Sequence, residues 1–130
     1  MRPRFGPPFT AMVVALIVTA CSAASGGDGV PPSAPPGGAV IVARDLAFDR
    51  ARLEVPSGVA FLLLFDNRDG ALHNVAILDK GDDHAVFVGE IFGGPGSRTY
   101  QVPPIAARTY AFRCDVHPDM AGTVVAAPPR

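Results

Sequence analysis

The chain has 130 residues, a formal net charge of −1 at pH 7 and 18% charged residues. This balance, without any basic stripe, excludes an electrostatic nucleic-acid-binding protein. The length leaves room for one compact domain beside an N-terminal part of low complexity.

Residues 1–20 are typical of a secretory signal peptide. Arg2 and Arg4 precede the apolar run Phe9–Ala20. The run has about 12 residues, whereas a membrane-spanning helix needs about 20. A buried core helix is the alternative, but the run lacks amphipathic spacing and a capping residue. We therefore expect residues 1–20 to be removed on export.

The apolar run ends in Val18-Thr19-Ala20-Cys21, which resembles the lipobox of bacterial lipoproteins. The resemblance implies that Cys21 is lipidated and anchors the protein to a membrane outside the cytoplasm, in the periplasm or at the cell surface. A single acyl chain binds a membrane only marginally, so stable anchoring takes several. Cleavage without lipidation is the alternative.

Residues 21–38 predict a tether rather than part of a fold. The stretch after Cys21 consists mainly of glycine, proline, alanine and serine. Such a composition buries too little apolar surface to fold. Residues 39–130 then remain as the domain.

This domain predicts an all-β fold, because short apolar segments alternate with turn signals and no window has a helical stripe. We expect strands at Val40–Ala43, Arg52–Val55, Val59–Asn67, His73–Leu78, Ala85–Glu90, Arg98–Val102, Thr109–Cys114 and Gly122–Ala126. Many short strands with regular turns indicate a β-sandwich or a small barrel.

Two of these segments predict which side chains face the core. In Arg108–Cys114 the residues alternate, so that Tyr110, Phe112 and Cys114 share one face of the strand. Phe61–Phe65, with the sequence FLLLF, is apolar throughout. It is typical of a strand that is covered on both faces or lies at the centre of a sandwich.

Composition draws attention to the loop after Arg108–Cys114. Without residues 1–20, nine Lys and Arg stand against twelve Asp and Glu, which gives a net charge of −3. Met120 is then the only methionine, and Cys114 is the only cysteine besides Cys21. A lone thiol in an oxidising compartment needs protection, and metal ligation provides it.

Cys114, His117 and Met120 lie three residues apart in this loop. A thiolate and two imidazoles, with a weak axial thioether, are the ligands of a blue-copper centre. The second imidazole comes from His73 or His84. We favour His73 because it opens an apolar segment directly after the Asp69-Gly70 turn, whereas His84 follows two aspartates in what we expect to be a solvated turn.

The sequence HNVAIL, from His73, and CDVHPDM, from Cys114, together resemble the cupredoxin family over residues 39–127. The family implies an eight-stranded, two-sheet Greek-key sandwich. It implies copper held by His73, Cys114 and His117, with Met120 as the axial ligand. The short gap before Met120 is that of the amicyanin-like form.

The resemblance also implies the roles of neighbouring residues and the function. Asn74 would join the two ligand loops by hydrogen bonds, and electrons would pass through His117 beside Pro118. A single loop cysteine implies a mononuclear centre. We therefore expect a monomeric electron carrier, not an enzyme, that meets transient redox-partner proteins and cycles between Cu(I) and Cu(II).

Other interpretations of these residues stay open at this point. Three of them concern Cys114. It is a buried structural thiol in the first, a zinc ligand in the second and part of a Cys–His nucleophilic pair in the third. A copper-delivery module without electron transfer is the main alternative function, and an interaction domain without metal is a third. Asp115 and Asp119 are expected to be solvated loop charges.

Overall fold

The structure is a computed structural model that describes Gly6 and residues 32–130. The expected lipidation site at Cys21, and all of the expected signal peptide except Gly6, lie outside these residues. Within the described part of the chain, no helix has the length and apolar character needed to cross a bilayer.

The described residues form eleven strands. In chain order they are β1 (Ala39–Arg44), β2 (Ala47–Phe48), β3 (Arg52–Pro56), β4 (Phe61–Asn67), β5 (Leu72–His73), β6 (Ala76–Asp79), β7 (Ala85–Val88), β8 (Phe92–Gly93), β9 (Gly96–Val102), β10 (Thr109–Arg113) and β11 (Ala121–Ala127). Three of them, β2, β5 and β8, have two residues each, so the eight longer strands correspond to the eight that were predicted.

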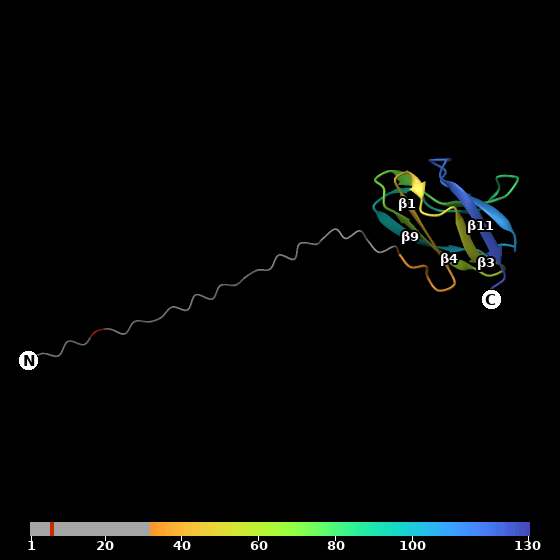
Figure 1. Ribbon diagram of the computed structural model, residues 1–130, viewed down its shortest axis with the longest axis horizontal. Coiled ribbons are helices and arrows are strands. Elements are labelled where there is room, and N and C mark those ends of the chain that lie inside the picture. The colour runs from red at the N-terminus through yellow and green to blue at the C-terminus, as the bar shows by residue number, and fades with distance from the viewer. Residues whose placement is uncertain (1–5, 7–31) are drawn as a thin grey trace, which may run out of the picture. The chain divides into compact units, whose positions relative to one another are not determined.

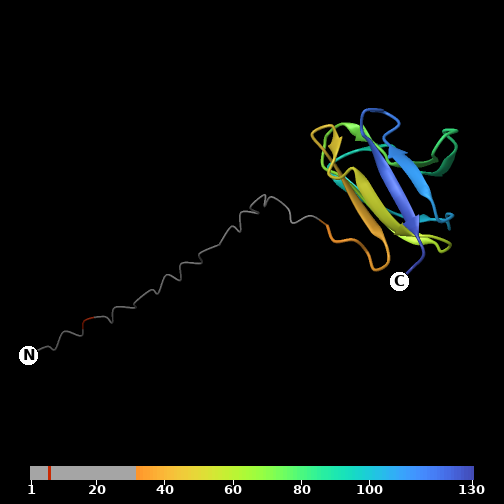
Figure 2. The ribbon, with the colours of Figure 1, turned by 45° about the vertical axis from the view of Figure 1, so that its right-hand side comes forward.

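Two main sheets pack face to face (Figures 1 and 2). One has the strand order β2-β1-β4-β9, and the other has the order β3-β11-β10-β6-β7. The pairs β1–β4 and β3–β11 are parallel. The chain passes from the first sheet to the second after β2 and returns to the first after β3. A small third sheet pairs β5 with β8. The predicted two-sheet, all-β sandwich is confirmed.

The core lies between the two sheets and follows from alternation along the strands. In β10, Tyr110 and Phe112 are buried and their neighbours are half-buried, as the pattern predicted. In β4, Phe61, Leu63 and Phe65 are buried, whereas Leu62 is 41% exposed. The FLLLF segment is therefore a central strand, between β1 and β9, that is fully buried on one face, whereas on the other face Leu62 is exposed and Leu64 is half-buried.

One predicted strand is interrupted. Residues 73–78 were expected to be continuous, but the chain leaves the ladder at Asn74 and Val75, between β5 and β6. The reason is that the buried Asn74 amide hydrogen-bonds to backbone groups of other loops. The interruption ends β5 at His73.

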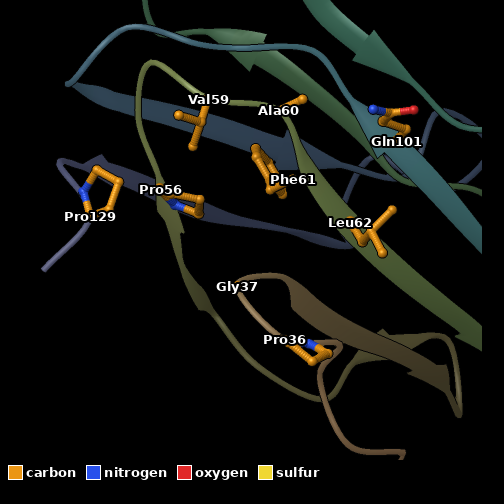
Figure 3. A pocket seen from close by; sticks show the side chains of 9 residues that line it. All are labelled: Pro36, Gly37, Pro56, Val59, Ala60, Phe61, Leu62, Gln101 and Pro129. Carbon is orange, nitrogen blue, oxygen red and sulfur yellow. The ribbon is translucent and has the colours of Figure 1, made fainter.

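The last part of the expected tether is turned against the domain. A hydrogen bond from the Gly38 N–H to the Pro35 carbonyl, 2.8 Å long, closes a turn. Pro36 and Gly37 line a shallow apolar pocket with Val59 and Leu62 (Figure 3). This pocket lies at the Phe61 end of β4, opposite the Asn67 end, and none of the candidate site residues lines it.

Candidate metal centre

Three potential ligand atoms converge at one end of the sandwich. The Cys114 Sγ lies 3.8 Å from the His73 Nδ1 and 3.9 Å from the His117 Nδ1. All three atoms lie within 4.8 Å of one another. The structure thus brings the His73 imidazole next to a thiol that lies 41 residues further along the chain, and the His117 imidazole joins them from the same loop as the thiol.

The elements that hold these side chains have different roles. His73 is the last residue of β5, and Cys114 directly follows β10, so both are fixed by strand ends. His117 and Met120 belong to the loop between β10 and β11. That loop is closed by hydrogen bonds of 2.9 Å from the Cys114 N–H to the Met120 carbonyl and from the Met120 N–H to the His117 carbonyl. The short spacing therefore gives a tight loop that is closed by its own backbone.

The four residues differ in exposure. His73 and Cys114 are fully buried, and Met120 is only 3% exposed, within the hydrophobic core cluster. His117 is half-buried, so it alone of the four has an edge open to solvent. Cys114 is a free thiol.

Asn74 joins the two loops that carry these residues. Its Oδ1 accepts a 2.8 Å hydrogen bond from the Asp115 N–H. Its Nδ2 donates to the Asp115 Oδ2 at 2.8 Å and to the Gly89 carbonyl at 3.2 Å. One buried amide thereby fixes the residue after His73 to the residue after Cys114.

Asp115 is exposed, as expected of a loop charge, but it also has hydrogen-bond partners within the protein. Its carboxylate accepts from the buried Asn74 amide, and it also accepts a 3.3 Å hydrogen bond from the Arg113 Nε. Its sequence position alone gave no sign of this contact, because Asn74 lies 41 residues away. Asp119 is exposed, as expected.

The carboxylate of Asp69, from the turn before β5, contacts His73. The Asp69 Oδ2 lies 2.8 Å from the His73 Nε2, the nitrogen that faces away from Cys114. Burial raises the pKa of Asp69, but hydrogen bonds from the Leu46 N–H, the Asp45 N–H and His73 outweigh it and hold the pKa below its usual value. Asp69 is therefore a carboxylate anion at neutral pH.

The two histidines weighed for the second imidazole have different surroundings. His73 is buried against Cys114, whereas His84 is exposed in the turn before β7. Among the described residues, the one group with the spacing of a metal site consists of His73, Cys114 and His117.

The donor set fits a single metal ion. With bonds of about 2.0 Å to nitrogen and about 2.3 Å to sulfur, trigonal donors lie about 3.7 Å apart. The measured separations of 3.8 Å and 3.9 Å agree with this value. Thiolate and thioether sulfur favour copper, and imidazole suits it as well.

Comparison with known proteins supports the family resemblance that the sequence motifs indicate. The sequence profile of the cupredoxin-like domain matches residues 9–126. Among curated proteins, none matches the chain.

Solved structures share the fold. Dithionite-reduced auracyanin from the photosynthetic bacterium Roseiflexus castenholzii is 23% identical, with a TM-score of 0.64 over 74% of this chain and 100% of that one. Auracyanin A, a "blue" copper protein from Chloroflexus aurantiacus, is 20% identical, with a TM-score of 0.61 over 69% and 100%. Amicyanin from Paracoccus versutus is 24% identical, with a TM-score of 0.55 over 72% and 84%.

Proposed function

The chain belongs to the cupredoxin-like family, and we propose that it is a copper-binding electron-transfer protein with one mononuclear type 1 site. The observation that carries the proposal is the convergence of the Cys114 Sγ on the Nδ1 atoms of His73 and His117, at 3.8 Å and 3.9 Å. A buried methionine in the same loop completes the donor types of a blue-copper centre.

Each of the four residues has its own part in this function. The Cys114 thiolate and the imidazoles of His73 and His117 would hold the ion, and the Met120 thioether would be the weak axial ligand. When bound, copper supplies one-electron chemistry between Cu(I) and Cu(II). The strand ends, the closed loop and the Asn74 hydrogen bonds keep the donors in place, which limits rearrangement during electron transfer.

The route of the electron follows from exposure. His73, Cys114 and Met120 are buried, so His117 is the candidate ligand through which a partner protein makes contact. Val116, 40% exposed, and the exposed Pro118 flank it. This small surface suits brief docking by redox partners, whose interfaces are typically small. The chain would act as a monomer and carry electrons without turning over a substrate.

The location proposed for this activity is outside the cytoplasm. Residues 1–20 would direct export, and lipidated Cys21 would anchor the protein to the membrane through residues 22–38. The lipobox-like Val18-Thr19-Ala20-Cys21 supports the anchor. An external location also accounts for a single thiol that a metal protects from oxidation.

Two cysteine variants test site and anchor together. Cys114→Ser removes the thiolate, so the copper-loaded protein should lose its intense visible absorption and its narrow copper hyperfine splitting in electron paramagnetic resonance. Cys21→Ser should keep both spectra but leave the membrane fraction and fail to incorporate fatty acid.

Each variant is the control for the other. Intense visible absorption in the Cys114→Ser protein contradicts the copper site. Retention of the Cys21→Ser protein in the membrane fraction contradicts the lipid anchor and leaves the copper assignment as it stands.

A further inference from the structure

Several independent contacts hold Asp69 beside His73, on the side of the imidazole that faces away from Cys114. Its side chain is 15% exposed, and its Oδ2 lies 2.8 Å from the Nε2 of the fully buried His73. Its own N–H donates to the Asn67 Oδ1 at 3.0 Å. Hydrogen bonds to both the backbone and the side chain of Asp69 therefore hold its carboxylate in position.

The same carboxylate also holds the β1–β2 turn. It accepts hydrogen bonds from the Asp45 N–H at 2.8 Å and from the Leu46 N–H at 3.1 Å. Asp45 and Leu46 have φ angles of 54° and 58°, a conformation that costs energy for residues other than glycine. Since two strained residues direct their N–H groups at Asp69, the turn fixes the carboxylate opposite His73.

This arrangement decides which nitrogen of His73 carries the proton. A carboxylate accepts hydrogen bonds only, so the Nε2 must donate. In a neutral imidazole the Nδ1 then keeps its lone pair, and the Nδ1 is the atom that faces the Cys114 Sγ.

We infer that Asp69 is a positioning residue that fixes the tautomer and orientation of His73 and, by its negative charge, lowers the reduction potential of the copper centre. The inference rests on the proposed function. A carboxylate hydrogen-bonded to a ligand histidine makes the imidazole a stronger donor. It also stabilises the more positive Cu(II) state over Cu(I), because opposite charges attract at short range.

Asp69→Asn keeps the shape of the side chain and removes its charge. We expect the copper affinity of the variant to fall by about 10- to 100-fold, the usual loss for the hydrogen-bond partner of a ligand. Cu(II) affinity should fall more than Cu(I) affinity, and the potential should therefore rise. Each tenfold difference between the two losses corresponds to about 59 mV.

Asp49→Asn is the matched control. Asp49 caps the same hairpin by accepting a 2.8 Å hydrogen bond from the Val42 N–H, and it is not among the residues that contact a candidate ligand. Both variants should lower the urea concentration at the unfolding midpoint. Only Asp69→Asn should raise the potential measured by voltammetry on the full-length, copper-loaded protein.

A second measurement needs no variant. In the metal-free full-length protein, nitrogen-15 NMR should show His73 protonated on Nε2, with that proton protected from exchange. Protonation on Nδ1 would overturn the inference.

The outcomes separate the two proposals. Failure of the wild-type chain to bind copper contradicts the proposed function. Copper binding with the same potential in wild type and Asp69→Asn overturns the inference alone, and so does an equal rise in potential in Asp49→Asn.

Discussion

At the scale of single residues, the candidate centre depends on buried polar side chains that are hydrogen-bonded through both their donor and their acceptor atoms. Asn74 uses both ends of its amide to join the Asp115 backbone and side chain to the Gly89 carbonyl, and it is fully buried. In such a network each group left without a partner costs about 1–3 kcal/mol. The polar residues around the donors therefore decide how firmly the donors are held.

Asn74→Ala should lower the free energy of unfolding by about 2–4 kcal/mol, because the Asp115 N–H and the Gly89 carbonyl lose their buried partner. Urea unfolding of the metal-free protein measures the loss. Gln101→Ala, at an exposed position of β9, is the control and should change stability by about 0.5 kcal/mol or less. Equal unfolding midpoints for the two variants would contradict the role given to Asn74.

Asp49 carries a prediction about pH. Burial raises its pKa, but hydrogen bonds from Arg50 and the Val42 N–H, with the charge of Arg50, hold the pKa below the model-peptide value of 3.8. The unfolded chain then binds more protons than the native protein between the two pKa values, so stability rises with pH in that range. The contribution is complete above about pH 5 and is lost as the pH falls below 3.8.

Asp49→Asn should remove this part of the pH dependence. Urea midpoints of the wild type should fall between pH 5 and pH 3, and those of Asp49→Asn should fall less steeply. Parallel curves for the two proteins would show that the Asp49 carboxylate does not contribute.

At the scale of elements, the pairing of β10 with β11 is what presents the ligand loop. Phe112 and Gly122 face each other across the pair, two residues before Cys114 and two after Met120. A Cβ at Gly122 would collide with the Phe112 ring and lie 2.7 Å from the Ala51 carbonyl oxygen. The glycine is therefore required by close approach and not by its backbone angle.

Gly122→Ala should cost about 1–3 kcal/mol, because the buried Phe112 ring and a backbone oxygen must both move. Gly70→Ala is the control, since a Cβ there meets no atom within 4 Å. Thermal unfolding compares the two. A stability loss at Gly70 as large as that at Gly122 would mean that the collision is not the cause.

The strands were largely predictable from the sequence, and the exceptions have physical causes. Alternation located Thr109–Arg113 because one face of β10 is buried and the other is not. The break after His73 was not predictable, since the pattern His73–Leu78 is apolar enough for a continuous strand. A side-chain hydrogen bond to a residue 41 positions away interrupts it.

At the scale of the whole molecule, most of the core lies outside the candidate centre, although Cys114 and Met120 belong to both. Tyr110, Phe65, Phe112 and Ile41 are fully buried between the sheets and belong to neither ligand loop. The domain should therefore remain folded when metal is removed, unlike small domains whose folding depends on zinc.

Copper should nevertheless raise the melting temperature. A ligand at 100 times its Kd stabilises the native state by about 2.7 kcal/mol, and each kcal/mol shifts the midpoint of a domain of this size by about 4–8 °C. We expect a rise of about 10–20 °C that a chelator reverses. Calorimetry with and without copper measures it, and Cys114→Ser should show little of the rise. A metal-free wild type that is unfolded at 25 °C would contradict this account.

The sequence by itself determined the all-β class and three of the four donor residues. Strand alternation follows from local geometry, and three of the donors lie within seven consecutive residues, Cys114 to Met120, so the covalent chain keeps them together. Only the tertiary structure decided that His73 and not His84 meets this loop, that Asp115 pairs with Asn74, and that Asp69 contacts the outer nitrogen of His73. These contacts join residues on different elements, and their direction depends on how the two sheets pack and on a strained turn between β1 and β2, which no local pattern records.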